Sequence, residues 1–234
     1  MPNWCDNVER IVGPKEQVKV LCDNLNKWIH TNIDPERPSD KWLGNIVYHS
    51  GLAADKNPGN WGYACRGELV DGFGYEENGN EGIIKFSTMT AWGPFPGTWY
   101  ALLEKCAPDA KYYYIAFEPD MCLYESNDIH HRFFHDEFVI SVSLCEKDKL
   151  PKKYVNTFLG IEDGFHWDWD PDEVIEIMED FTGIHVVDRH NDDEVKLLMD
   201  AFDTKVVKDL EYTDNYINVY RIEYYDPEKV EDHG

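Results

Sequence analysis

The 234-residue sequence contains no long uninterrupted stretch of apolar residues. A helix that crosses a membrane needs about 18 to 20 of them in a row, so we expect no membrane-spanning segment. The opening MPNWCDNVERIVG also lacks the basic start and apolar stretch of a secretion signal. We therefore predict a cytoplasmic protein that does not bind membranes. Because 42% of the residues are hydrophobic and 14% aromatic, the chain can form a buried core.

Closely spaced cysteines are absent as well. The six cysteines stand at least 16 residues apart, so the chain has no CxxC pair and no zinc-ribbon spacing. No GxSxG or SxxK nucleophile motif occurs. The glycines of the loop at 57–63 are not followed by the lysine of a phosphate-binding loop. We expect reduced cysteines with packing roles and no bound cofactor.

Positive charge is scarce. The chain has 46 Asp and Glu against 22 Lys and Arg, a net charge of −24, of which −20 falls in residues 118–234. Between Tyr154 and Asp188 there are ten acidic residues and no Lys or Arg. Such a surface repels phosphate groups, so direct nucleic-acid binding and binding to anionic membranes are not expected. It attracts a basic protein partner or a divalent cation, and the alternative is that the charge serves only solubility.

The first half of the sequence alternates between strand-like and helix-like segments. The apolar periodicity predicts, in order, a strand at 7–12, a helix at 15–30, a hairpin at 66–74 and 82–88, a helix at 96–106 and a strand at 111–117. This order is that of the split βαβ, or ferredoxin-like, arrangement, an antiparallel sheet with both helices on one face. The residues expected to be buried together are Leu21, Leu25, Trp28, Leu102 and Leu103.

The second half is expected to extend this fold as an acidic α+β region. Its predicted elements are a strand at 138–144, helices at 171–181 and 191–202, and a terminal hairpin at 205–212 and 216–225. We predict a ferredoxin-like domain over residues 1–127, with an insertion at 31–64. The acidic region at 128–234 either forms a second domain or packs with the first as one unit.

Three short segments resemble one known family. The opening Met1-Pro2-Asn3-Trp4-Cys5-Asp6-Asn7, the segment Phe86-Ser87-Thr88 with Ala91-Trp92-Gly93-Pro94-Phe95-Pro96, and Ala116-Phe117-Glu118-Pro119-Asp120-Met121 are similar to the YubB-like family. Its members are phage and conjugative-plasmid proteins of unknown function with a ferredoxin-like domain. The chain departs from the family at Pro119 and Asp120, where the family usually carries glycine. The resemblance implies a ferredoxin-like core, a bacterial or phage cytoplasm and a mobile-element origin, and it implies no catalytic residues.

An acidic stretch at 166–180 is the first candidate site. Asp168, Asp170 and Asp172 match positions one, three and five of a calcium-binding loop, but position six, which requires glycine, is Glu173. Asp170 before Pro171, with Glu173 three residues later, is typical of a capped helix start. We predict a helix cap, with a bound cation as the alternative. The predicted acidic binding face comprises Asp168, Asp170, Asp172, Glu173, Glu176, Glu179 and Asp180, and the predicted interface aromatics are Trp92, Trp167 and Trp169.

Histidines and carboxylates near the middle of the chain are the second candidate. His131 and His135 are four residues apart, a spacing that suits two zinc ligands on a helix, with Asp136 beside them. The segment leads into a strand, where this spacing separates the side chains by about 13 Å, so we favour an exposed polar turn. A second acidic group comprises Glu118, Asp120, Glu125 and Asp128, which we interpret as a solvated loop rather than a magnesium site.

Two functions of different classes remain open. One is a non-enzymatic protein whose acidic face engages a basic protein partner, in the extreme by mimicking nucleic acid. The other is a metal-dependent enzyme that uses the carboxylate and histidine clusters. Carboxylates that converge in a pocket with strongly shifted pKa values would favour the enzyme.

Overall fold

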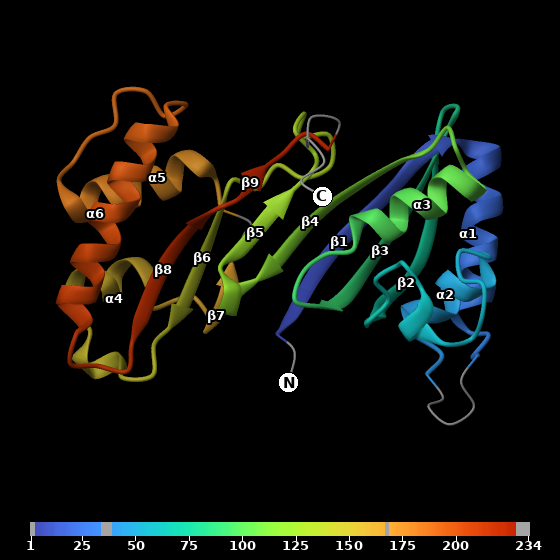
Figure 1. Ribbon diagram of the computed structural model, residues 1–234. Helices are drawn as coiled ribbons and strands as arrows, with labels where there is room; N and C mark the ends of the chain where they lie inside the picture. Colours follow the sequence, from blue (N-terminus) through green and yellow to red (C-terminus); the bar gives the residue numbers. More distant parts are fainter. Residues whose placement is uncertain (1–2, 34–38, 167–168, 228–234) are drawn as a thin grey trace. The chain divides into compact units, whose positions relative to one another are not determined.

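The computed structural model describes residues 3–33, 39–166 and 169–227 (Figure 1). The chain forms two compact units, one of Met1–Phe134 with Glu223–Gly234 and the other of His135–Ile222. The sequence-based boundary lay at residue 127. In the structure the first unit extends to Phe134 and also includes the segment from Glu223 onward. The second unit is therefore an insertion in the sequence of the first.

A six-stranded sheet in the order β2-β3-β1-β4-β5-β9 forms the base of the first unit. Its strands are β1 (Trp4–Pro14), β2 (Gly67–Asn78), β3 (Glu81–Ala91), β4 (Lys111–Glu118), β5 (Leu123–Ser126) and β9 (Glu223–Tyr224). All neighbours pair antiparallel except β5 and β9, which are parallel. The predicted hairpin is confirmed as β2 and β3, and Gly79 in its turn has φ 63°, a conformation that glycine adopts without strain.

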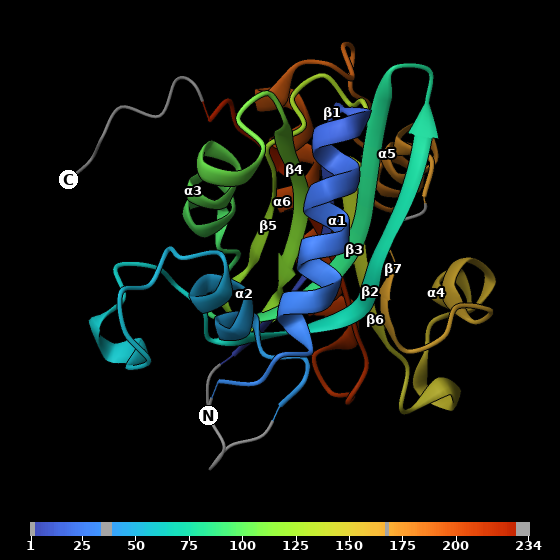
Figure 2. The ribbon, with the colours of Figure 1, turned by 90° about the vertical axis from the view of Figure 1, so that its right-hand side faces the viewer.

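Helices α1 (Lys15–Ile29) and α3 (Pro96–Cys106) cover the same face of this sheet (Figure 2). The buried residues of α1 recur every three or four positions, which places them on one side of the helix. Leu21, Leu25, Leu102 and Leu103 are buried in one cluster, as predicted, and Trp28 packs half-buried against it. This core fixes both helices over the centre of the sheet.

The excursion between α1 and β2 carries a helix and a small core of its own. Helix α2 spans Leu43–His49, and a short 3₁₀ turn covers Pro58–Asn60. The rings of Trp42 and Trp61 stack with centroids 5.9 Å apart. The buried residues of this small core are Ile33, Val47, Trp61 and Cys65.

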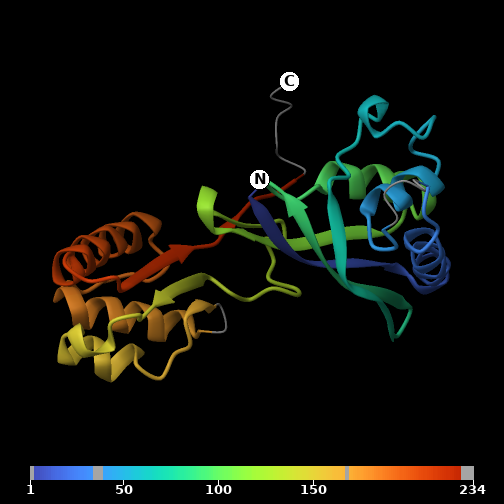
Figure 3. The ribbon, with the colours of Figure 1, turned by 90° about the horizontal axis from the view of Figure 1, so that it is seen from below.

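The second unit packs three helices against a three-stranded antiparallel sheet in the order β7-β6-β8. Its elements are β6 (Phe138–Ser143), α4 (Lys152–Phe158), β7 (Gly164–His166), α5 (Pro171–Thr182), α6 (Asp192–Leu210) and β8 (Tyr216–Arg221). The helices lie along one face of the sheet (Figure 3) and share a core with it. The predicted terminal hairpin is wrong, because α6 continues to Leu210 and β8 pairs with β6 instead.

Candidate functional site

The acidic stretch at 170–180 forms the start and the outer side of α5. The Asp170 side chain accepts hydrogen bonds from the backbone N–H groups of Asp172 (2.9 Å) and Glu173 (3.3 Å). Pro171 occupies the first turn. The helix-cap interpretation is therefore confirmed, and carboxylates in this first turn are stabilised by the helix dipole. Asp168 and Trp167, two further predicted site residues, lie outside the described residues.

Arg189 partly neutralises the predicted acidic face, and the Lys153 ammonium donates to the backbone oxygen of Asp180 at the end of it. The Arg189 guanidinium lies 2.7 Å from an oxygen of Asp172, 3.4 Å from Glu176 and 3.9 Å from Glu179. The hydrogen bond to Asp172 raises the pKa of Arg189. Arg189 follows directly after the stretch without basic residues, and reasoning from the sequence missed it because the contact depends on the loop folding back over α5.

Glu179 differs from the other acids of this face. Its side chain is only 12% exposed, and it accepts a hydrogen bond of 2.7 Å from the backbone N–H of Val186. Glu179 thus anchors the loop after α5. Glu173 and Asp180 are exposed on α5, and Asp172 and Glu176 are about 70% exposed beside Arg189. The solvent-facing acidic surface is accordingly smaller than the predicted set.

The start of α6 adds carboxylates next to this surface. Asn191 caps the helix, accepting hydrogen bonds from Asp193 and Glu194. Asp192 pairs with Arg221 at 2.8 Å. The second unit has 22 acidic and nine basic residues, a net charge of −13, and the first has −11. The acidic excess therefore belongs to both units, because the end of the chain and residues 118–134 are part of the first.

The predicted interface aromatics have different surroundings. Trp92 belongs to the first unit, is 51% exposed and has the positive φ of 70°. The guanidinium of Arg66 lies 4.8 Å from the centre of its ring. Trp169 belongs to the second unit and is half-buried against its core. Trp169 therefore has a packing role, whereas Trp92 offers an exposed ring.

The histidine pair is divided between the units. His131 is in the first unit, where its ring lies 4.3 Å from that of Tyr224, and its φ of 49° places it in a tight turn. His135 and Asp136 belong to the second unit. Within residues 3–33, 39–166 and 169–227, no group of three or more His, Cys, Asp or Glu side chains is arranged to hold a metal ion.

Three carboxylates of this group, those of Glu118, Glu125 and Asp128, accept hydrogen bonds within the protein, and the side chain of Asp120 lies outside the described part of the structure. Glu118 is 1% exposed and accepts a hydrogen bond of 2.5 Å from the backbone N–H of Met121. Asp128, also 1% exposed, accepts from the backbone N–H groups of Phe133 (2.6 Å) and Phe134 (3.0 Å). The interpretation as a solvated loop was wrong for these two residues, which hold turns in place.

A buried acid in the first unit was not singled out from the sequence. Glu9 is 1% exposed, and one carboxylate oxygen accepts a hydrogen bond of 2.6 Å from the hydroxyl of Tyr112. Its other oxygen has no partner among the described residues. Burial raises the pKa of Glu9 to about 8, and the hydrogen bond from Tyr112 opposes this rise. The two-residue periodicity of β1 could have indicated this burial, because residues 5, 7, 9 and 11 all lie on the buried face of the strand.

Tyrosine hydroxyls continue this polar cluster along β4. Tyr114 donates to Glu125 at 2.7 Å and shares a hydrogen bond with Tyr225, just beyond β9. Burial raises the pKa of Tyr114 far above its ordinary value and that of Tyr225 to about 12. These phenols therefore stay protonated at neutral pH.

The side chain of Asn127 hydrogen-bonds to the backbone of β4 just beyond the end of β5. Its amide oxygen accepts from the backbone N–H of Tyr114 (2.8 Å), and its amide nitrogen donates to the backbone oxygen of Tyr112 (2.9 Å). The same nitrogen donates to the hydroxyl of Tyr100 on α3 (2.9 Å). One side chain thus replaces a neighbouring strand and ties α3 to the sheet.

Beside Asn127 the first unit has a groove of about 570 Å³. It runs between the end of α3, the start of β4 and the loop after β5. We call it the tyrosine groove, lined principally by Tyr100, Leu103, Tyr112, Tyr113, Asn127 and Ile129. Its volume is within the range of about 300 to 1,000 Å³ that small-molecule sites occupy.

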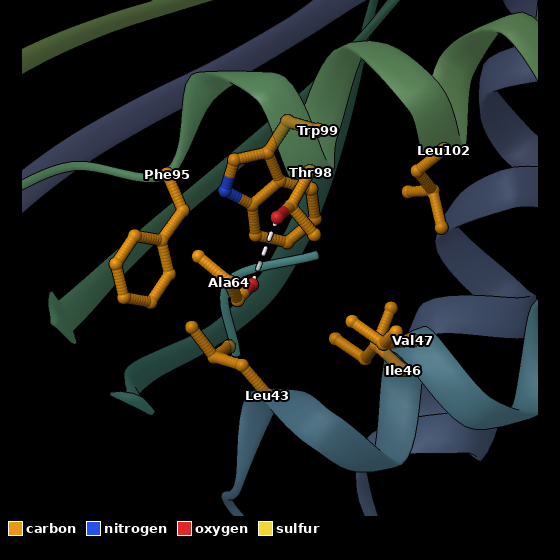
Figure 4. A pocket seen from close by; sticks show the side chains of 8 residues that line it. All are labelled: Leu43, Ile46, Val47, Ala64, Phe95, Thr98, Trp99 and Leu102. Atoms are coloured by element: carbon orange, nitrogen blue, oxygen red, sulfur yellow. Dashed lines mark hydrogen bonds between the residues drawn. The ribbon is translucent and has the colours of Figure 1, made fainter. Parts of the chain in front are cut away.

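A second cavity lies between α2 and α3 (Figure 4) and is lined mainly by apolar side chains. Its volume is only about 10 Å³, which is the space of one water molecule. The Thr98 hydroxyl donates to the backbone oxygen of Ala64 across its mouth, at 2.8 Å. This cavity is a gap in packing rather than a ligand site.

No helix in the described part of the chain has the length and apolarity to cross a bilayer. Comparison of the chain with protein-family models, curated proteins and solved structures finds no match.

Proposed function

We propose that this chain is a non-enzymatic binding protein whose second unit engages a basic segment of another protein. The observation that carries the proposal is the row of exposed carboxylates on the outer side of α5. Glu173, Glu176 and Asp180 lie on this row, in a unit with 22 acidic and nine basic residues. Long-range attraction would steer a basic partner toward this surface.

The packing of α5 fixes the direction in which these acids point. Val174, Ile175, Met178 and Phe181 are buried in the core, so the opposite side of the helix faces solvent. The three acids of the row are three and four residues apart, which spaces them by about 4.5 Å and 6 Å along the helix. Alternate residues of an extended chain are spaced by about 6.6 Å. An extended segment with Lys or Arg at every second position therefore comes close to the spacing of Glu176 and Asp180.

The metal-dependent enzyme receives less support from the geometry. The carboxylates of α5 line an open helix side, and Glu118 and Asp128 hold turns. Glu9 has the shifted pKa that an enzyme hypothesis calls for, but its carboxyl is 1% exposed and lies under α3. These arrangements favour binding over catalysis.

As part of the same proposal, we assign the first unit to the ferredoxin-like fold and the chain to the YubB-like family. Support for the fold comes from the strand order β2-β3-β1-β4 with α1 and α3 on one face. Residues 4–7 of the resembling opening segment form the start of the central strand β1, and Glu118 in the third segment caps the turn that follows β4. A cytoplasmic, mobile-element protein that does not bind nucleic acid directly is consistent with the charge.

A fluorescent decalysine peptide tests the acidic row directly. The test variant combines Glu173→Gln and Asp180→Asn, and the matched control combines Glu68→Gln and Asp71→Asn on β2 of the first unit. All four side chains are exposed, so both variants remove two charges without opening a core. Anisotropy titrations over a series of salt concentrations give the affinity of each protein.

We expect the test variant to bind the peptide about threefold to tenfold more weakly, and the control to bind within about twofold of the unaltered protein. Added salt should weaken binding by slowing association. Equal losses in the two variants would mean that only the total charge attracts the peptide, and the proposed site on α5 would be refuted.

A further inference from the structure

We propose that the tyrosine groove binds an uncharged, polar, ring-shaped molecule, up to the size of a nucleoside or a disaccharide. The groove lies wholly in the first unit, and its volume of about 570 Å³ is ample for such a ligand. This inference is independent of the acidic surface on the second unit.

The aromatic walls of the groove are held in place by their neighbours. The ring of Tyr113 packs against Phe133, with centroids 5.1 Å apart. Tyr100 meets Tyr112 edge to face at 5.7 Å, and the hydroxyl of Tyr112 is fixed by Glu9. Tyr112 is only 3% exposed and its ring is stacked on Trp99 and Tyr114. The half-buried rings of Tyr100 and Tyr113 therefore provide the flat apolar surface that suits stacking against the ring of a ligand.

A hydrogen-bond donor is positioned among these rings. The Tyr100 hydroxyl accepts from Asn127, and this oxygen has no other hydrogen-bond partner in the described part of the chain. Both amide protons of Asn127 are used, one on Tyr100 and one on the backbone of Tyr112. Burial raises the pKa of Tyr100, so its proton is retained and is available to an acceptor on the ligand.

The charges around the groove favour an uncharged ligand. Glu104 and Asp226 carry negative charge, while Lys111 and His130 supply a basic group and an imidazole on the same lining. The first unit as a whole has a net charge of −11, which disfavours phosphates and carboxylates. Because the lining of the groove carries charges of both signs, it does not favour a cationic ligand either. Hydroxyl and ring-nitrogen groups of a neutral ligand can pair with the Glu104 carboxylate and the His130 imidazole.

Saturation-transfer NMR on the full chain tests the proposal with two sets of probes. Adenosine and uridine represent nucleosides, and maltose and cellobiose represent disaccharides, each at about 1 mM, where weak binding is still detected. The variants are Tyr100→Phe, which removes only a hydroxyl, and Tyr113→Ala, which removes one wall. Tyr48→Phe on α2 is the matched control, because Tyr48 does not line the groove.

We expect saturation transfer to the ring protons of one probe set, which identifies the source of the ligand. Loss of one hydrogen bond in Tyr100→Phe should weaken that probe about threefold to tenfold, and Tyr48→Phe should leave it unchanged. Tyr113→Ala should weaken it at least as much, and far-ultraviolet circular dichroism checks that each variant is folded. Absence of transfer for all four probes, or binding unaffected in both groove variants, would overturn the proposal.

Discussion

Glu9 is a carboxylic acid in the core of the first unit, and its protonation is coupled to folding. Burial raises its pKa from the ordinary 4.5 to about 8. Below pH 4.5 the group is protonated in the folded and unfolded chains alike. Between 4.5 and about 8 the folded chain keeps a proton that the unfolded chain has lost, so stability falls as the pH rises. Above about 8 both states are ionised and the slope ends.

We therefore predict that Glu9→Gln flattens the pH dependence of stability. Gln retains an oxygen for the Tyr112 hydroxyl but does not ionise. The unaltered protein should lose up to about 1.4 kcal/mol per pH unit through Glu9, and the variant should lose correspondingly less. Urea unfolding from pH 5 to pH 8, compared between the two proteins, measures this difference.

Asp203 supplies the control for this experiment. Burial raises the pKa of Asp203 from 3.8 to about 6. Its effect on the pH dependence of stability therefore ends at a lower pH than that of Glu9. Asp203→Asn should alter the slope below about pH 6 and leave the range above it unchanged. Identical slopes in the unaltered protein and Glu9→Gln between pH 6 and pH 8 would contradict the assignment to Glu9.

At the scale of secondary structure, Asp170 determines where α5 begins. Asp170→Ala removes the oxygen that accepts from two backbone N–H groups and should cost about 1 kcal/mol of unfolding free energy. Asp170→Asn removes the same charge but keeps the acceptor, so it should cost less. Urea unfolding with sodium chloride, or with calcium chloride at equal ionic strength, separates a cap from a calcium site. If Asp170→Ala lowered the unfolding free energy only in calcium chloride, the assignment of Asp170 as a helix cap would be refuted.

Helix α1 is held by its buried stripe, and Leu25 lies at the centre of that stripe with no exposed surface. Leu25→Ala should reduce the free energy of unfolding by about 2 to 5 kcal/mol, because it leaves a cavity under the helix. Val20, on the same helix, is 60% exposed. Val20→Ala should change stability by less than about 1 kcal/mol, since alanine favours helix. Equal effects in denaturant unfolding would contradict the packing described for α1.

The elements that the sequence predicted well have a clean periodicity. Helix α1 and the β2–β3 hairpin belong to this class. The segment at 205–212 was misread because Val206 and Val207 favour strands. In the structure Val206 and Leu210 instead continue the buried stripe of Phe202 at four-residue spacing. The core of the second unit therefore overrode local propensity.

The candidate sites were harder to predict, because they depend on contacts between distant segments. Asp170 was predicted correctly, since a helix cap is a local pattern. The contacts of Arg189 with α5 depend on a folded loop, and the bond between Glu9 and Tyr112 joins residues 103 positions apart. The tyrosine groove likewise draws on α3, β4 and the end of the chain. Spacing along the sequence contains none of this information.

At the scale of the whole molecule, a net charge of −24 opposes the compact state. Salt shortens the distance over which charges interact, from about 30 Å at 0.01 M to about 8 Å at 0.15 M. We predict that the melting temperature rises with sodium chloride over this range. The variant with Glu173→Gln and Asp180→Asn should show a smaller rise in differential scanning calorimetry. A melting temperature that falls with salt would mean that attractive ion pairs outweigh the repulsion.

The insertion of the second unit between β5 and β9 has a consequence for synthesis. The first unit receives its last strand only after all of His135–Ile222 has been translated. At about 5 to 20 residues per second, these 88 residues take roughly 4 to 18 seconds. Throughout that delay Tyr114 lacks its Tyr225 partner and the outer edge of β5 is uncovered. The nascent chain thus spends seconds with an open sheet edge, the period in which a chaperone or another nascent chain has access to it.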